Sequence, residues 1–183
     1  QNVVNNTFFD CAKRCDITVL ADERFGGNEA ARVYNNAAER MSGHRVRTVQ
    51  EFPLPGMTGN NWNGYVTGLD INTVIRDPEN WDFRPHMESD LVDKGKNLEP
   101  FVKEWIGESR DIGAYEYGDS IYWIPGRKED KASMPVPPNG TASAMADCDL
   151  MWLEALGTKK HRVYFGTSVN SMEMVSEQTS NIY

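Results

Sequence analysis

The sequence lacks an apolar run that approaches the ~20 residues a membrane-spanning helix needs. Its first residues, Gln1 to Asn6, have neither the basic start nor the apolar block of a signal peptide. We therefore predict no membrane span. Because the chain starts at Gln1 and not at methionine, we expect a processed chain or a piece of a longer one.

Cysteine and clustered positive charge are both scarce. The three cysteines, Cys11, Cys15 and Cys148, are too few for a disulfide framework. Cys11 and Cys15 could bridge locally, and an odd count leaves at least one thiol without a partner in this chain. The 19 Lys and Arg residues face 27 Asp and Glu residues, which gives a net charge of −8. Nucleic-acid binding is excluded as a function class, because phosphates require clustered cations.

Familiar catalytic motifs are also missing. The sequence has no glycine-rich phosphate loop, no Gly-x-Ser-x-Gly elbow and no Cys/His nucleophile pattern. The three histidines, His44, His86 and His161, are not at metal-ligand spacing, and we expect them at the surface. We predict no cofactor and no metal site. The alternative is a calcium site, because hard cations prefer clustered oxygen ligands, here from Asp77, Glu79, Asp82, Asp90 and Asp93.

Short apolar segments around asparagine pairs dominate the first third of the chain. The pairs begin at Asn5, Asn35 and Asn60, and β-branched or aromatic residues flank them. Such a repeat suits a solenoid of short strands, in which side-chain amides stack and hydrogen-bond along the axis. Two alternatives remain open: the pairs simply mark turns, or residues 29–41 form a short amphipathic helix. Residues 51–68, with two prolines and four glycines, should be irregular and exposed.

The run Asp111-Ile-Gly-Ala-Tyr-Glu-Tyr-Gly118 alternates like a strand between two glycines. We expect Ile112, Ala114 and Glu116 on one side and the tyrosines on the other. With the blocks 77–80, 82–85 and 89–95, it resembles the final coils of right-handed parallel β-helix proteins, including the chondroitinase-B-like and alginate-lyase-like polysaccharide lyases. The resemblance implies that residues 1–118 are C-terminal coils of a β-helix in an all-β protein, with 111–118 as the last rung.

Residues 119–134 read as a linker, and 135–183 resemble the opening half of an Ig or fibronectin type III-like sandwich. Its strands would place Leu150 and Trp152 in the core, with Val163 and either Phe165 or Tyr164 from the next strand. A complete domain of this kind needs ~100 residues. We therefore expect either that the chain was cut or that another polypeptide supplies the missing strands, since an open half-sandwich exposes its edges.

Lyases of the resembled group neutralise a uronate and abstract the neighbouring proton, but no stretch here matches their catalytic motif, so we assign no catalytic residue. Whether the parent protein is an enzyme stays open. The basic residues of the first third could form an acidic-polysaccharide face, with an aromatic ring to stack on sugars; the alternative is that they are solvated charges. The candidate glycan-binding residues are Arg24, Arg32, Arg40, Arg45 and Trp62.

The sequons at Asn5 and Asn139 allow N-glycosylation and favour an extracellular location. We therefore expect a non-catalytic scaffold segment of a secreted β-helix protein. Its partners would be the remainder of the parent β-helix, the missing sandwich strands and an acidic polysaccharide. The alternatives are an extracellular structural or adhesive assembly protein without enzymatic activity, and a glycan-binding module.

Overall fold

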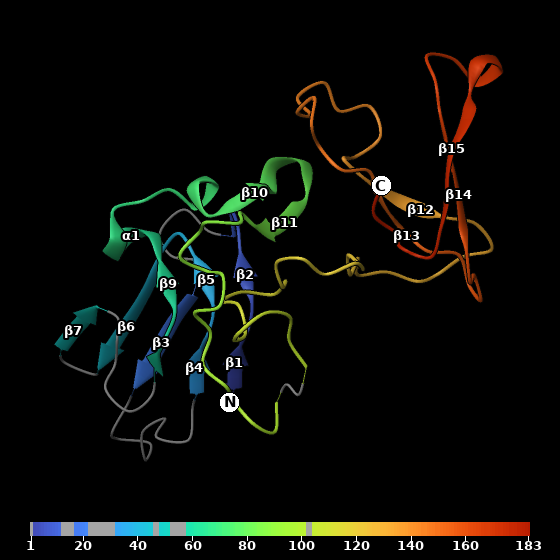
Figure 1. Cartoon of the computed structure of the whole chain (residues 1–183). Helices are drawn as coiled ribbons and strands as arrows, with labels where there is room; N and C mark the ends of the chain where they lie inside the picture. The colour runs from blue at the N-terminus through green and yellow to red at the C-terminus, as the bar shows by residue number, and fades with distance from the viewer. Residues whose placement is uncertain (1, 12–16, 22–31, 46–47, 52–57, 102–103) are drawn as a thin grey trace. The chain divides into compact units, whose positions relative to one another are not determined.

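The computed structural model describes residues 2–11, 17–21, 32–45, 48–51, 58–101 and 104–183. These residues form short strands with almost no helix, so the chain is all-β (Figure 1). It divides into two compact units: the first unit is 1–78 with 83–118, and the second unit is 79–82 with 119–183.

Small sheets make up the first unit (Figure 1). Its elements are β1 (Asn2–Val4), β2 (Thr7–Phe8), β3 (Ile17–Ala21), β4 (Arg32–Tyr34), β5 (Ala37–Ala38), β6 (Met41–Arg45), β7 (Thr48–Glu51), β8 (Thr58–Gly59), β9 (Trp62–Asn63), α1 (Gly64–Thr67), η2 (Ile71–Thr73), β10 (Ile75–Asp77), η3 (Pro78–Asn80) and β11 (Asp82–Pro85), of which η3 falls mainly in the second unit.

Successive repeats of the chain contribute successive strands to the same sheets. Sheet A has the order β1-β4-β8 and sheet B the order β2-β5-β9, and all their pairings are parallel. Sheet C has the order β3-β6-β7, in which β6 pairs in parallel with β3 and antiparallel with β7. The alternative of a helix over 29–41 is therefore wrong for its described part, where β4 and β5 lie. The prediction that residues 51–68 are irregular and exposed is also wrong where β8, β9 and α1 lie. Residues 52–57 of this stretch lie outside the described part.

Each asparagine pair forms the corner between a strand of sheet A and the next strand of sheet B. The first asparagine of each pair, Asn5, Asn35 or Asn60, has a φ of 55°, 55° or 51°. This left-handed conformation turns the chain sharply, and asparagine tolerates it better than most residues do. Because all three corners bend in the same way, the side chains that follow lie in register across the repeats.

The amides of these corners hydrogen-bond to one another in two columns. In the first column Asn60 Nδ2 donates to Asn35 Oδ1 over 2.9 Å, and Asn35 Nδ2 donates to Asn5 Oδ1 over 3.2 Å. In the second column the donors run the opposite way, from Asn6 to Asn36 and from Asn36 to Asn61, at 3.0 Å each. The predicted hydrogen bonding between stacked asparagines is confirmed.

Both faces of sheet B are covered. Ala37 and Ala38 are neighbours on β5, so their side chains point to opposite faces, yet both are fully buried. Ala38 packs with Val33 and Met41, and partly buried residues near the N-terminus complete this cluster. Ala37 belongs to a second cluster, whose other buried members are Trp62, Ile71, Val74, Ile75, Leu91 and Ile112. The later segments of the first unit thus supply the cover for sheet B.

The motif 111–118 is not a strand, so the expected last rung is wrong. Gly113 and Gly118 have φ values of 112° and 82°, which interrupt an extended backbone. Ile112 is buried in the second cluster, but Ala114, expected on the same side, is exposed. Two hydrogen bonds fasten the turn to the solenoid-like repeats: Gly113 N donates to Asn35 O over 2.8 Å, and Ala114 N donates to Thr7 Oγ1 over 3.1 Å.

Replacing Gly113 should destabilise the first unit. A Cβ at this position would lie 2.8 Å from Thr7 Oγ1, and the φ of 112° disfavours any L side chain. We expect Gly113→Val to lower the free energy of unfolding by about 2 to 4 kcal/mol. Hydrogen exchange of residues in the first unit measures this loss.

A matched pair of variants separates the cost of a steric clash with Thr7 from the cost of a side chain at positive φ. Gly68 also has a positive φ, of 74°, but nothing lies within 4 Å of the Cβ it would gain. Gly68→Ala should therefore cost only about 1 to 2 kcal/mol, less than Gly113→Ala. Equal costs for the two alanine variants would contradict the close approach of Gly113 to Thr7.

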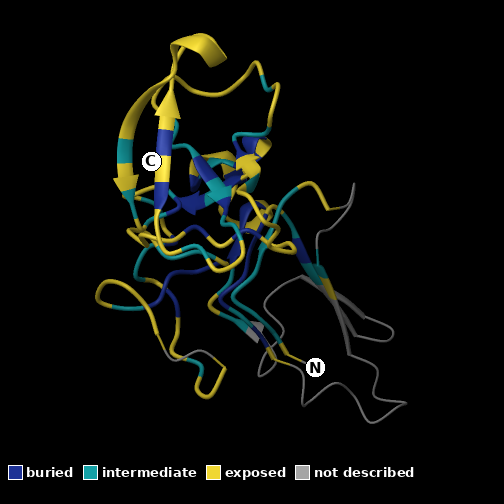
Figure 2. Cartoon of the chain, turned by 90° about the vertical axis from the view of Figure 1, so that its right-hand side faces the viewer, coloured by how far each residue is buried: buried dark blue, intermediate teal, exposed yellow. Residues whose placement is uncertain are grey.

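The second unit contains two antiparallel strand pairs. Its strands are β12 (Ser133–Val136), β13 (Met151–Leu153), β14 (His161–Phe165) and β15 (Glu173–Gln178), with η4 (Val169–Ser171) between the last two. β12 pairs with β13, and Leu150 and Tyr183 exchange backbone hydrogen bonds of 2.7 and 2.9 Å on the other side of β13. β14 pairs with β15, and η4 at the tip of this hairpin is exposed (Figure 2).

The core of the second unit differs from the sequence expectation. Met151 and Leu153 are buried, whereas Leu150 and Trp152 are only half-buried. The run Leu-Met-Trp-Leu is apolar throughout, so its alternation did not reveal which face is inside. On β14, Val163 is buried as predicted, but Tyr164 and Phe165 are 51% and 61% exposed. Tyr122 and Ile124, in the segment expected to be a linker, are buried.

Candidate functional site

The basic residues predicted for glycan binding are only partly described. Arg40 is half-buried, and its guanidinium carbon lies 4.0 Å from the centroid of the Tyr65 ring. Tyr65 belongs to α1 and is 54% exposed, so this stack is at the surface. Arg32 is an exposed residue at the start of β4, and Arg45 ends β6. Arg24 lies outside the described residues.

Trp62, in contrast, is not available for sugar stacking. It lies in β9 with 4% of its surface exposed, and it packs in the cluster that covers sheet B. Its indole nitrogen is buried, and no described residue is its hydrogen-bond partner. The exposed aromatic residue nearest in sequence is Tyr65, which the sequence pattern did not distinguish from a core residue.

The turn at 111–118 contains the buried Asp111 and the half-buried Glu116. Asp111 is 1% exposed. Its two carboxylate oxygens accept hydrogen bonds from the backbone nitrogens of Asp93, over 2.7 Å, and Tyr117, over 2.5 Å. Burial raises the pKa of Asp111 above its ordinary value, against the effect of these two bonds. The pKa of Glu116 is also raised, first by burial and then by the charge of Asp111. Glu116 Oε2 accepts hydrogen bonds from the backbone nitrogens of Ile106 and Asp111. The two carboxylates therefore join the turn to the segments that contain Asp93 and Ile106.

These raised pKa values make the first unit less stable as the pH rises. A carboxyl group whose pKa is raised by folding favours the folded state while it is protonated. That contribution is lost as the pH rises from about 4, the ordinary pKa, through the raised folded value. We expect Glu116→Gln to become stabilising relative to the natural protein as the pH rises over this window, because it removes one of the two repelling charges and keeps an acceptor oxygen.

Urea unfolding between pH 4 and 7 measures this difference. The control is Glu88→Gln, which removes an exposed carboxylate and corrects for the change in net charge. The difference in unfolding free energy between Glu116→Gln and the control should grow with pH. If it does not, the proposed repulsion between Glu116 and Asp111 is contradicted.

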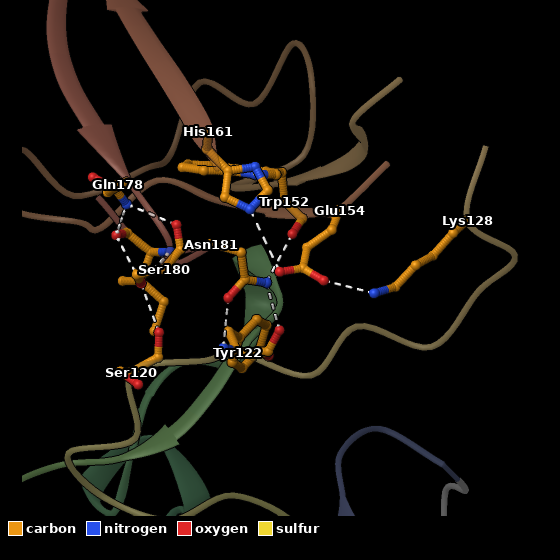
Figure 3. Close-up of polar contacts among 10 residues, drawn as sticks. Ser120, Tyr122, Lys128, Trp152, Glu154, His161, Gln178, Ser180 and Asn181 are labelled. Atoms are coloured by element: carbon orange, nitrogen blue, oxygen red, sulfur yellow. Dashed lines mark hydrogen bonds and ion pairs between the residues drawn. The ribbon is translucent and has the colours of Figure 1, made fainter. Parts of the chain in front are cut away.

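In the second unit, four polar side chains form a continuous line (Figure 3). Lys128 Nζ lies 2.6 Å from Glu154 Oε2, and Glu154 Oε1 lies 3.4 Å from His161 Nε2. Trp152 Nε1 donates to His161 Nδ1 over 3.1 Å. Since an indole can only donate, the proton of a neutral His161 is on Nε2, which faces Glu154. The Lys128 ammonium, by hydrogen bonding, lowers the pKa of Glu154.

This line ends beside a pocket of about 360 Å³. The pocket is lined by Trp152, by residues of β14 and by small residues from the preceding loops. His161 is buried, its Nδ1 accepts a hydrogen bond from Trp152 Nε1, and its Nε2 lies 3.4 Å from Glu154 Oε1. The sequence did not reveal this pocket, because Trp152 and His161 lie on strands of different pairs.

The remaining predicted residues are dispersed. Asn139 is exposed in the connection from β12 to β13, where a glycan would be accessible. Asn5 is half-buried, and its side-chain oxygen is part of the first asparagine column. Cys11 is exposed and Cys148 half-buried, while Cys15 lies outside the described residues. The local bridge from Cys11 to Cys15 stays a prediction.

Within the described part of the chain, no three His, Cys, Asp or Glu side chains are grouped so that they could hold a metal ion. No helix among the described residues is both long and apolar enough to cross a membrane. No protein-family model, curated protein or solved structure matches the chain.

Proposed function

We propose that this chain is a non-catalytic scaffold segment of a secreted protein, in which the first unit forms C-terminal coils of a right-handed parallel β-helix. The main support is the pair of asparagine columns. They connect three consecutive repeats, each of which adds one strand to sheet A and one to sheet B. Such a repeat gives a rigid rod-like support. The second unit is then part of a fibronectin type III-like sandwich attached to this support.

The chemistry of the buried polar groups supports a non-catalytic role. Asp111 and Glu116 accept backbone N–H groups, and His161 is held between Trp152 and Glu154. Each of these groups is thus occupied in joining segments of the chain. We expect no rise in unsaturated-uronate absorbance when the 183-residue chain is incubated with alginate, pectate or glycosaminoglycans. A rise that scales with protein concentration would overturn the non-catalytic assignment.

The scaffold also binds acidic glycans weakly through Arg40 and Tyr65. The exposed phenol ring can stack on a sugar, and the guanidinium over it supplies the positive charge that a uronate needs. Calorimetric titration with oligogalacturonate should detect binding that Arg40→Ala and Tyr65→Ala each weaken by about tenfold. Arg127→Ala, which removes an exposed cation of the second unit, is the control. Equal affinity in all four proteins would contradict this site.

A second candidate is an extracellular assembly protein without an enzymatic parent. Apolar side chains exposed on the hairpin β14–β15 favour it, namely Tyr164, Phe165, Val169, Met172, Met174 and Val175. Exposed Cys11 offers a site for a covalent link between chains. Non-reducing electrophoresis tests that link: an oxidised chain that runs only as a monomer would count against covalent assembly.

A further inference from the structure

One edge of β14 is open. Among the described residues, β14 pairs only with β15, in a two-stranded sheet. Alternate residues of an antiparallel strand direct their N–H and C=O groups away from the partner strand, so the open edge of β14 presents unpaired backbone groups. An edge of this kind can accept one more strand.

The pocket described above follows this open edge. Its lining includes the five consecutive residues Lys160 to Tyr164 and no residue of β15. Side chains alternate between the two faces of a strand, so contact with four consecutive residues of β14 and with none of β15 indicates a pocket that runs along the β14 edge away from β15. The pocket is therefore a groove beside the unpaired backbone groups of β14.

The rest of the groove lining is mostly apolar and held in place. It consists of Trp152, Ala132, Ala155 and Thr158. The Trp152 ring meets the His161 ring edge-on, with 5.3 Å between their centroids, and the hydrogen bond between them fixes the indole. Glu154 contacts the other ring nitrogen of His161 and is itself paired with Lys128 (Figure 3). A lining fixed in this way loses little conformational entropy when a ligand binds.

The rim of the groove has surplus positive charge. Lys160 Nζ lies 3.1 Å and Arg162 Nε 2.9 Å from the carboxylate of the same residue, Glu177. Both cations remain about two-thirds exposed. Two positive charges thus share one negative charge, and an acidic side chain of a partner would complete the pairing.

We propose that the open edge of β14 binds an extended, acidic segment of a partner protein by β-strand addition. The backbone of the segment pairs with β14, its small apolar side chains contact Trp152, and its carboxylates lie beside Lys160 and Arg162. This site goes beyond the proposed scaffold and glycan functions and does not use Arg40 or Tyr65.

The probe is a blocked hexapeptide of alternating valine and glutamate, titrated into the full chain by calorimetry. We expect binding together with slower amide hydrogen exchange at residues 160–164. Two further probes have N-methyl groups on all valines or on all glutamates, which removes backbone donors and keeps the side chains. At least one of them should bind about tenfold more weakly. Unchanged affinity for both would overturn strand addition.

Variants locate the site on the protein. The double variant Lys160→Glu and Arg162→Glu should bind the probe about tenfold more weakly, whereas Lys159→Glu, an exposed cation outside the groove, should not. Ala132→Trp fills the groove from an exposed position and should abolish binding with an unchanged melting temperature.

Three further results would overturn the proposal: no binding of the unmethylated peptide, binding of oligogalacturonate that Ala132→Trp abolishes, and self-association of the chain that Ala132→Trp prevents. The second would make the groove a saccharide site and the third an interface between copies. The peptide titrations do not involve Arg40 or Tyr65, so failure of strand addition is distinguishable from failure of the proposed glycan site.

Discussion

Replacing Asn36 by aspartate should lower the free energy of unfolding of the first unit by about 3 to 5 kcal/mol, the largest effect we expect in this unit. Asn36 is fully buried, and its Nδ2 donates to Val3 O, Tyr34 O and Asn61 Oδ1 over 2.9 to 3.1 Å. Aspartate has the same shape but turns an oxygen towards three acceptors. The variant thus keeps the volume of the side chain and loses every donor.

Amide hydrogen exchange is the suitable measurement, because it reports the two units separately. Residues of sheets A and B should exchange faster in Asn36→Asp, and residues 119–183 should not change. Asn36→Ala should cost a similar amount, since it removes the acceptor of Asn6 N and the amide donor to Val3 O. Asn72→Ala, at an exposed position, is the control and should cost less than about 0.5 kcal/mol. Similar costs at positions 36 and 72 would contradict the structural importance of the column.

The second large effect is expected at Asn181. This residue is 2% exposed and joins two segments of the second unit (Figure 3). Its Nδ2 donates to Tyr122 O at 2.7 Å and Trp152 O at 2.8 Å, and its Oδ1 accepts Tyr122 N at 2.8 Å. Asn181→Asp should lower the free energy of unfolding of this unit by about 3 kcal/mol at pH 7, because an ionised oxygen would face two carbonyls.

The same variant has a predictable pH dependence. Burial and the two carbonyls should raise the pKa of the new carboxyl group in the folded state, so its protonated form is favoured there. The destabilisation relative to the natural protein should therefore shrink as the pH falls towards about 4, where a protonated oxygen donates to one carbonyl. Asn139→Asp, at an exposed position of the same unit, is the control. Destabilisation that is independent of pH would contradict the hydrogen-bond pattern at Asn181.

Much of the first unit could be predicted because its signal is local. The residue pair Asn-Asn favours a left-handed corner wherever it occurs, and the β-branched residues around it favour short strands. Three pairs at spacings of 30 and 25 residues then suggested stacking, which the hydrogen bonds at Asn35 and Asn36 confirm.

The motif at 111–118 shows where such local patterns fail. Its two sets of residues, with Ile112, Ala114 and Glu116 on one side and the tyrosines on the other, follow the period of a strand, but a strand also needs a neighbour with which to pair. Here the carboxylate of Asp111 and the hydroxyl of Thr7 accept the backbone N–H groups instead. Thr7 lies 107 positions from Ala114 in the sequence, so the local pattern contains no information about this partner.

The all-β class, the repeated asparagine corners and the absence of familiar catalytic motifs could be predicted from the sequence, because each follows from the conformational preference or chemistry of neighbouring residues. The burial of Trp62 and the exposure of Tyr65 beneath Arg40 became visible in the folded chain alone. The structure likewise shows that Trp152 and His161, from separate strand pairs, line one groove beside β14. The physical reason is that exposure and pairing depend on which distant segments cover a residue, and its neighbours in the sequence do not specify that cover.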